Sequence, residues 1–279
     1  PDGQGVVRRL LGMQTMLERA FSAYLRIGGF PAAVNDTLRT GHTTVSPAIV
    51  HTLWDSIVGD MTKAGREPMA ALRLLQAIGT SLGSTLSWLS ASRAMGFEKP
   101  DTARQYAEQL AEIYAVLTVY YWDIATHRLE PRKQRKVYWL DPLIGCMPEM
   151  LIPGTSSPPA DGLIENAVAG GLFRSAAQTL IQANAVPGSI AYWRSNNDRE
   201  IDFVIPQVSD LSRPRFPIEV KGDAAAGLAG ARRAIQLAYA RGLVLSRTVF
   251  DWRPDVAVIP VWAFLAGLRE QPFRSVTLG

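Results

Sequence analysis

Residues 200–205 have the sequence Glu-Ile-Asp-Phe-Val-Ile, and residues 216–221 have the sequence Phe-Pro-Ile-Glu-Val-Lys. Branched and aromatic side chains in runs of this length favour β-strands. Successive side chains of a strand point to opposite faces, so Asp202 lies on the face opposite its apolar neighbours and Glu219 shares a face with Lys221. If the two strands are neighbours, Asp202, Glu219 and Lys221 converge at one end of a sheet.

The residues around these two strands predict a mixed α/β sheet flanked by helices. In chain order we expect a helix at 163–181, strands at 190–194, 200–205 and 216–221, a helix at 224–241, strands at 243–246 and 256–259, and a helix at 261–268. Residues 195–198, Ser-Asn-Asn-Asp, predict a turn between the first two strands. Residues 150–162 are rich in proline and glycine and indicate a domain boundary ahead of the sheet.

The N-terminal half of the chain is mainly helical by its apolar periodicity. We expect helices at 5–26, 47–63, 68–82, 84–95 and 101–116, followed by strands at 117–124 and 136–140. Ser46, Ser84 and Asp101 are residue types that cap helix N-termini. Three short helices followed by a two-stranded hairpin is the element order of a winged helix, in which helix 101–116 would be the recognition helix.

Two carboxylates and an amine at one end of a sheet suit metal-assisted hydrolysis of a phosphodiester. Asp202 and Glu219 carry the hard oxygen ligands that Mg²⁺ prefers, and Lys221 would orient the attacking water or stabilise the developing charge. Glu165, on the helix before the strands, would complete the acidic site. The alternative is an ordinary half-buried strand, because sheets with one solvated face also alternate apolar and polar residues.

The net charge of the chain is +4, and one short segment accounts for all of it. Residues 128–136 contain one acid, Glu130, and five basic residues: Arg128, Arg132, Lys133, Arg135 and Lys136. A concentrated basic segment suits contact with nucleic-acid phosphates, although a solvated loop can have the same composition. Arg104, on the expected recognition helix, is a further candidate for contact with DNA.

The composition excludes several classes of protein. Apolar residues make up 47% of the chain and charged residues 19%, which is typical of a globular protein and not of a disordered one. The single cysteine, Cys146, excludes a disulfide within the chain and a zinc site built from cysteines. No apolar run reaches the roughly 18 residues of a membrane span, and no signal peptide is visible. We therefore expect a cytoplasmic protein without a membrane partner.

Several short motifs resemble the core of PD-(D/E)XK nucleases. They are Tyr192–Arg194, Glu200–Val204 and Pro217–Lys221, which follow the helix that holds Glu165. More narrowly, the chain resembles the C-terminal region of prokaryotic AAA+-type ATPases, in which a winged helix precedes a domain of unknown function of this nuclease-like superfamily. Three further motifs carry the narrower resemblance: YLRIGGFP at 24–31, KVYWLD at 136–141 and GLIEN at 162–166.

The resemblance covers nearly the whole chain, and it implies three segments: residual lid or linker helices of the ATPase at 1–45, a winged-helix-like domain at 46–150 and a nuclease-like domain at 160–279. It also implies a catalytic set of four residues: Glu165, Asp202, Glu219 and Lys221. The three acids of this set would hold Mg²⁺ or Mn²⁺.

The chain has no G-x-x-x-x-G-K-[ST] loop, so it lacks the phosphate cradle of an ATPase and should not hydrolyse ATP itself. ATP would bind to an N-terminal ATPase domain outside this sequence. That domain is an expected partner, together with nucleic acid, DNA in the first place, and further copies of the chain in an oligomer. The leading hypothesis is a DNA-binding module with a Mg²⁺-dependent nuclease site. Two alternatives stay open: a non-catalytic module that binds a protein or regulates the ATPase, and a toxin–antitoxin or defence role of the full-length protein.

Overall fold

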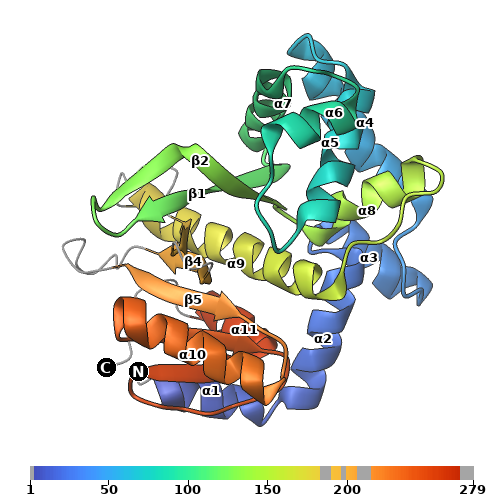
Figure 1. The fold of residues 1–279 in the computed structure, drawn as a ribbon. Coiled ribbons are helices and arrows are strands. Elements are labelled where there is room, and N and C mark those ends of the chain that lie inside the picture. Colours follow the sequence, from blue (N-terminus) through green and yellow to red (C-terminus); the bar gives the residue numbers. More distant parts are fainter. Residues whose placement is uncertain (1–2, 183–189, 196–198, 206–214, 271–279) are drawn as a thin grey trace. The chain divides into compact units, whose positions relative to one another are not determined.

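The computed structural model describes residues 3–182, 190–195, 199–205 and 215–270 (Figure 1). The chain forms two compact units. The helical unit comprises residues 20–118 and 134–170, and the sheet unit comprises residues 1–19, 119–133 and 171–279. The predicted turn at 195–198 lies largely outside the described residues. The predicted division into segments 1–45, 46–150 and 160–279 stays a prediction.

The helical unit contains α3 to α8 and parts of α2 and α9. The bounds are α2 Gln14–Ile27, α3 Pro31–Thr40, α4 Pro47–Lys63, α5 Pro68–Ser81, α6 Trp88–Met95, α7 Pro100–Glu112, α8 Pro142–Leu151 and α9 Ala160–Gln182. Proline occupies the first position of α3, α4, α5, α7 and α8. Proline suits this position because an N–H in the first turn has no partner within the helix. The helices predicted at 47–63 and 68–82 are confirmed by α4 and α5.

Two predicted helices have different bounds in the structure. The helix predicted at 5–26 is interrupted after α1, Gly3–Leu11, where the N–H of Gly12 bonds to the carbonyl of Arg9 at 3.1 Å in a tight turn. The apolar spacing continues on both sides of this turn, so periodicity alone does not reveal it. The helix predicted at 101–116 ends at Glu112, because Tyr114 adopts a left-handed conformation with φ of 57° that reverses the chain.

The predicted helix caps are partly wrong. The helix expected from Ser84 begins four residues later, because the N–H of Leu86 bonds to the carbonyl of Arg135 at 2.7 Å and Ser87 accepts the capping bond. Ser46 stands at the start of α4, but its side chain makes no cap, and its N–H bonds to the Asp36 carboxylate at 2.9 Å. Asp101 lies in the first turn of α7 and is not its cap.

The sheet has seven strands in the order β2-β1-β3-β4-β5-β6-β7. The strands are β1 Val116–Asp123, β2 Arg128–Trp139, β3 Ala191–Arg194, β4 Glu200–Ile205, β5 Phe216–Val220, β6 Gly242–Ser246 and β7 Val256–Pro260. β4 is antiparallel to β3 and β5, whereas the pairs β1–β3, β5–β6 and β6–β7 are parallel. The prediction of a mixed α/β sheet is therefore confirmed. β2 begins eight residues before the strand predicted at 136–140, so the basic segment 128–136 is a strand and not a loop.

Helices cover the sheet within its unit. α10, Ala225–Tyr239, connects β5 to β6 and lies against β4, β5, β6 and β7 (Figure 1). Its Leu228, Ala231 and Ile235 share a buried core with Ile201 and Val244 of the strands. α11, Val261–Glu270, packs against β7 and against α1. Within the described ranges, none of the helices combines the length and the hydropathy that a membrane span needs.

Candidate functional site

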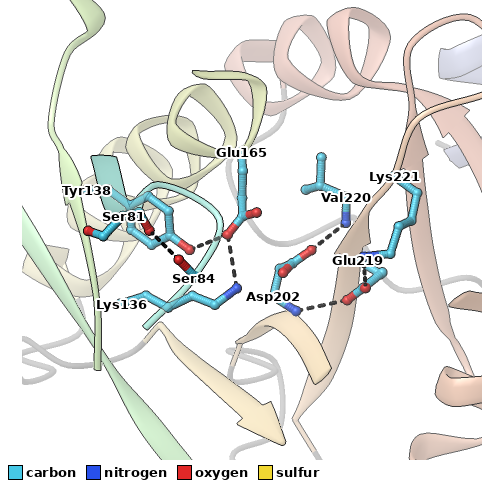
Figure 2. Close-up of polar contacts among 9 residues, drawn as sticks. All are labelled: Ser81, Ser84, Lys136, Tyr138, Glu165, Asp202, Glu219, Val220 and Lys221. Atoms are coloured by element: carbon cyan, nitrogen blue, oxygen red, sulfur yellow. Dashed lines mark hydrogen bonds and ion pairs between the residues drawn. The ribbon is translucent and has the colours of Figure 1, made fainter. Parts of the chain in front are cut away.

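The ends of β4 and β5 are joined by carboxylates. The two strands pair as antiparallel neighbours through Phe203 with Ile218 and Val204 with Pro217. One residue further, the N–H of Asp202 donates to Glu219 Oε2 at 2.9 Å, and the N–H of Val220 donates to Asp202 Oδ2 at 2.9 Å (Figure 2). Each acid is thus held by the backbone of the opposite strand, and the two carboxylates lie side by side.

Lys221 completes this group. Its Nζ lies 2.7 Å from Glu219 Oε1, and its backbone N–H is fixed by the carbonyl of Leu245 on β6 at 2.8 Å. The side chain of Lys221 is 43% exposed, whereas that of Glu219 is 4% exposed, so the amine connects a buried carboxylate to the surface. The structure therefore brings together Asp202, Glu219 and Lys221, as the alternation of the two strands predicts.

The environment of this pair changes the protonation of Glu219. Both faces of β4 are covered, and Ile201 to Ile205 are all buried, so the polar face expected from the alternation is not solvated. Burial, and next the neighbouring charge of Asp202, raise the pKa of Glu219 to about 8, while Lys221 acts in the opposite direction. The pair of carboxyls therefore retains a proton to higher pH than two separate acids would.

The two acids fit a divalent cation. Mg²⁺ is commonly held by one or two protein carboxylates, with water and substrate phosphates as its other ligands. A cation beside Asp202 and Glu219 would also replace the proton that burial and like charge impose on Glu219. No group of three or more His, Cys, Asp or Glu side chains in the described part of the chain is placed to hold a metal. The donor set is thus a pair of carboxylates.

Glu165 has a different environment in the helical unit. Its Oε1 accepts hydrogen bonds from Lys136 Nζ at 3.0 Å and from the Tyr138 hydroxyl at 2.6 Å (Figure 2). Next to it, Asn166 Oδ1 accepts a bond from the N–H of Trp139 at 2.8 Å. These bonds join the start of α9 to β2. Glu165 therefore has a buried cationic partner of its own within this unit, which the sequence did not predict.

Two of the predicted nucleic-acid contacts are buried. The side chain of Lys136 is fully buried in its ion pair with Glu165, and Arg135 is 8% exposed with its guanidinium over the Trp88 ring at 4.9 Å. The structure therefore buries these two side chains, and their contact with phosphates stays a prediction. The three other basic residues of the segment, Arg128, Arg132 and Lys133, are exposed on the part of β2 in the sheet unit.

The expected recognition helix is not basic. Arg104 forms ion pairs with Asp101 at 3.2 Å and with Glu108 at 2.6 Å, both on α7. With Glu112, this helix carries three carboxylates against one guanidinium. Negative charge repels phosphates, so α7 is poorly suited to lie along DNA.

The sequence contained a signal for the partners of Glu165. Lys136 and Tyr138 are two residues apart on one strand, and this spacing places them on the same face. A buried lysine and a buried tyrosine each need a polar partner, and Glu165 serves both. Strand spacing alone does not identify that partner, because Glu165 is 27 residues away from Tyr138 in the sequence.

Comparison with known proteins gives two matches. Residues 18–151 match the family model of a domain of unknown function, DUF8612, and residues 160–264 match that of another, DUF4143. The second family is found in C-terminal regions associated with AAA-type ATPases. No curated protein and no solved structure matches the chain. The chain is therefore similar to two domains of unknown function that follow one another along the sequence.

Proposed function

We propose that this chain is the nucleic-acid-directed part of an AAA-type ATPase, and that Asp202, Glu219 and Lys221 form a Mg²⁺-dependent site for phosphodiester hydrolysis. The observation that supports it most is the buried pair of carboxylates beside an amine that reaches the surface. The same proposal includes the finer fold assignments, a winged helix for α5 to α7 with the β1–β2 hairpin and a PD-(D/E)XK nuclease-like fold for α9 to α11.

Each residue of this site would have its own role in the hydrolysis. Mg²⁺, when bound, would neutralise charge on the phosphate and lower the pKa of a water molecule. Asp202 and Glu219 would hold the ion through their carboxylate oxygens, and Glu219 would release its proton as the ion binds. Lys221 would turn its exposed amine to the phosphate or to the attacking water and stabilise the charge that develops there.

The exposed cations of the sheet unit would hold the substrate. Arg128, Arg132 and Lys133 lie on β2, which is the neighbour of β1 in the sheet. Contacts of this kind bind phosphates without regard to sequence and weaken as salt increases. They would position a nucleic acid on the unit that contains the carboxylates.

Cleavage assays test the catalytic part of the proposal. The chain is incubated with single- and double-stranded DNA and RNA in Mg²⁺ or Mn²⁺, beside Asp202→Asn, Glu219→Gln and the control Glu98→Gln, whose side chain is 88% exposed. We expect metal-dependent cleavage that falls at least about a hundredfold in the first two variants and is unchanged in the control. Equal cleavage by all four proteins would show that another site, or a contaminant, is responsible.

A second candidate function is a non-catalytic module that binds a protein or regulates the ATPase. The observation that favours it is the saturation of Glu219, whose Oε1 is bound to Lys221 and whose Oε2 accepts the N–H of Asp202. In this role the carboxylates would only fasten the ends of β4 and β5. Calorimetric titration with Mn²⁺ separates the two functions, because the fastening role predicts no binding and the catalytic role predicts binding that Glu219→Gln abolishes.

A further inference from the structure

A cavity lies in the sheet unit, apart from the carboxylate pair. Its volume is about 540 Å³, which is within the range of small-molecule sites. The ends of β1 and β3 form one wall, on which Trp193 is on the sheet face that packs against α10, and α10 forms the other wall with Ala234, Leu237 and Ala238. Tyr121 also lines the cavity, but it pairs with Tyr192 in the strand register, so its ring lies on the opposite sheet face. Leu237 lines the cavity and is 65% exposed. The cavity thus has apolar surface from Trp193 and from the α10 side chains that is open to solvent.

The aromatic ring at the cavity is held in place by its neighbours. The Trp193 ring meets the Tyr239 ring edge to face at 6.1 Å. On the opposite sheet face, the Tyr121 hydroxyl donates to the carbonyl of Arg194 at 3.3 Å and so joins the ends of β1 and β3. A ring that is already fixed loses little conformational entropy when a ligand binds, so Trp193 suits a planar aromatic group.

Positive charge surrounds these walls. Among the described residues that line the cavity, Arg194 and Arg199 are the basic ones and Asp123 is the acidic one. Arg199 is exposed, and its backbone is anchored by mutual hydrogen bonds with Ser195, from its N–H to Ser195 Oγ at 3.1 Å and from the Ser195 N–H to its carbonyl at 2.7 Å. The Asp123 carboxylate accepts the N–H of Ala125 at 2.8 Å and so serves the hairpin turn. An anionic ligand with an aromatic ring matches this lining.

We propose that the cavity binds an unpaired nucleotide of a single-stranded nucleic acid. Its base would lie against Trp193, between the sheet and α10, and its phosphate would lie beside Arg199. Arg128 and Arg132, exposed on β2 next to β1, extend the positive surface beyond the cavity and favour a strand over a free nucleotide. A base inside a duplex is stacked on both faces, so the cavity favours single strands over duplexes. The inference rests on the proposed function in taking nucleic acid as the ligand, and it adds the form of that ligand.

Binding is measured on the full chain in EDTA, so that cleavage plays no part. The probe is a fluorescein-labelled 12-nucleotide DNA strand, followed by anisotropy, with the matching duplex and a nucleoside monophosphate as competitors. We expect the single strand to bind more tightly than the duplex. Arg199→Ala, and Ala234→Trp, which fills the cavity, should each weaken binding by about tenfold, the scale of one stacked base. Arg233→Ala, an exposed arginine of α10 that does not line the cavity, should have no effect.

Three outcomes overturn the inference. One is equal binding of strand and duplex. Another is unchanged affinity in both Arg199→Ala and Ala234→Trp, with their folding verified by circular dichroism. The third is a nucleoside monophosphate that binds the cavity while the strand does not compete for it. The control Glu98→Gln should bind the strand as the natural chain does. Absence of cleavage together with intact strand binding therefore rejects only the proposed function. Cleavage without preferential strand binding rejects only the inference.

Discussion

At the scale of a single residue, Glu219 makes the stability of the folded chain depend on pH. Its ordinary pKa is 4.5, and in the folded protein its pKa is about 8. Between these two pH values the folded chain holds a proton that the unfolded chain has lost. The contribution of this residue to stability is therefore most favourable near pH 5 and is lost as the pH rises towards 8 and above.

The variant Glu219→Gln should remove this dependence. Glutamine keeps the shape of a protonated glutamate and does not ionise. We expect the natural chain to lose roughly 2–4 kcal/mol relative to the variant between pH 5 and pH 9. Urea unfolding at pH 5, 7 and 9 measures the difference, and the comparison with the variant cancels the other titrating groups. A difference that does not change with pH would contradict the burial of a protonated Glu219.

The same residue sets the pH dependence of cation binding. A cation that displaces one proton from Glu219 should bind about tenfold more weakly for each pH unit below 8, with a plateau of affinity above that value. Mn²⁺ titrations in two buffers of different ionisation enthalpy measure both the affinity and the proton released. Constant affinity between pH 6 and pH 9 would place the ion away from Glu219.

At the scale of elements, the buried ion pair between Glu165 of α9 and Lys136 of β2 stabilises the helical unit. Lys136→Met leaves the Glu165 carboxylate buried without its cation, and we expect a loss of about 3–5 kcal/mol. Lys63→Met, in an exposed pair with Asp60, should cost less than about 1 kcal/mol. Both are measured by urea unfolding. The double variant Lys136→Met, Glu165→Gln should recover part of the loss, and no recovery would mean that Lys136 acts through packing alone.

Exposed and paired arginines should differ in their effect on nucleic-acid binding. Arg132 is exposed on β2, whereas Arg104 is neutralised on α7 by two carboxylates. Arg132→Ala should reduce the slope of log K against log salt by about 1, the effect of one lost phosphate contact. Arg104→Ala should leave the slope unchanged. The reverse result would restore α7 as the helix that faces DNA.

Local patterns predicted the elements whose partners are near in sequence. Helix α4 was predicted with its bounds at Pro47 and Lys63, because a proline start and apolar periodicity act within the helix itself. The convergence of Asp202, Glu219 and Lys221 was predicted because alternation fixes the relation of two short strands. The start of α6 was predicted wrongly, because Leu86 bonds to Arg135, 49 residues away. The burial of Lys136 was not predicted for the same reason, because its partner Glu165 is 29 residues away.

At the scale of the whole molecule, the two compact units are each built from separate stretches of the chain. The sheet unit takes residues from three parts of the chain, so residues 160–279, predicted as a nuclease-like domain, lack β1, β2 and α1. Within that unit β3 would lose its parallel neighbour β1, and α11 would lose α1, whose Val6 and Leu10 are buried.

A fragment of residues 160–279 should therefore not unfold cooperatively. Circular dichroism and urea unfolding of this fragment, beside the full chain, test the expectation. We expect a broad transition with a reduced m-value, because less surface becomes exposed when a partly formed sheet unfolds. A sharp transition would show that these residues form an independent domain, as the resemblance to an appended nuclease-like domain implies.

The carboxylates that fasten β4 to β5 have a consequence for hydrogen exchange. In the middle of the strand pair, amide hydrogens are bonded to peptide carbonyls. The amide hydrogens of Asp202 and Val220 are bonded to acid side chains instead. Their exchange with deuterium then depends on what those acids hold, and much less on the opening of the sheet. Two amide signals in a spectrum would thus reveal, without any substrate, whether a proton, an ammonium group or a metal ion occupies the end of the strands.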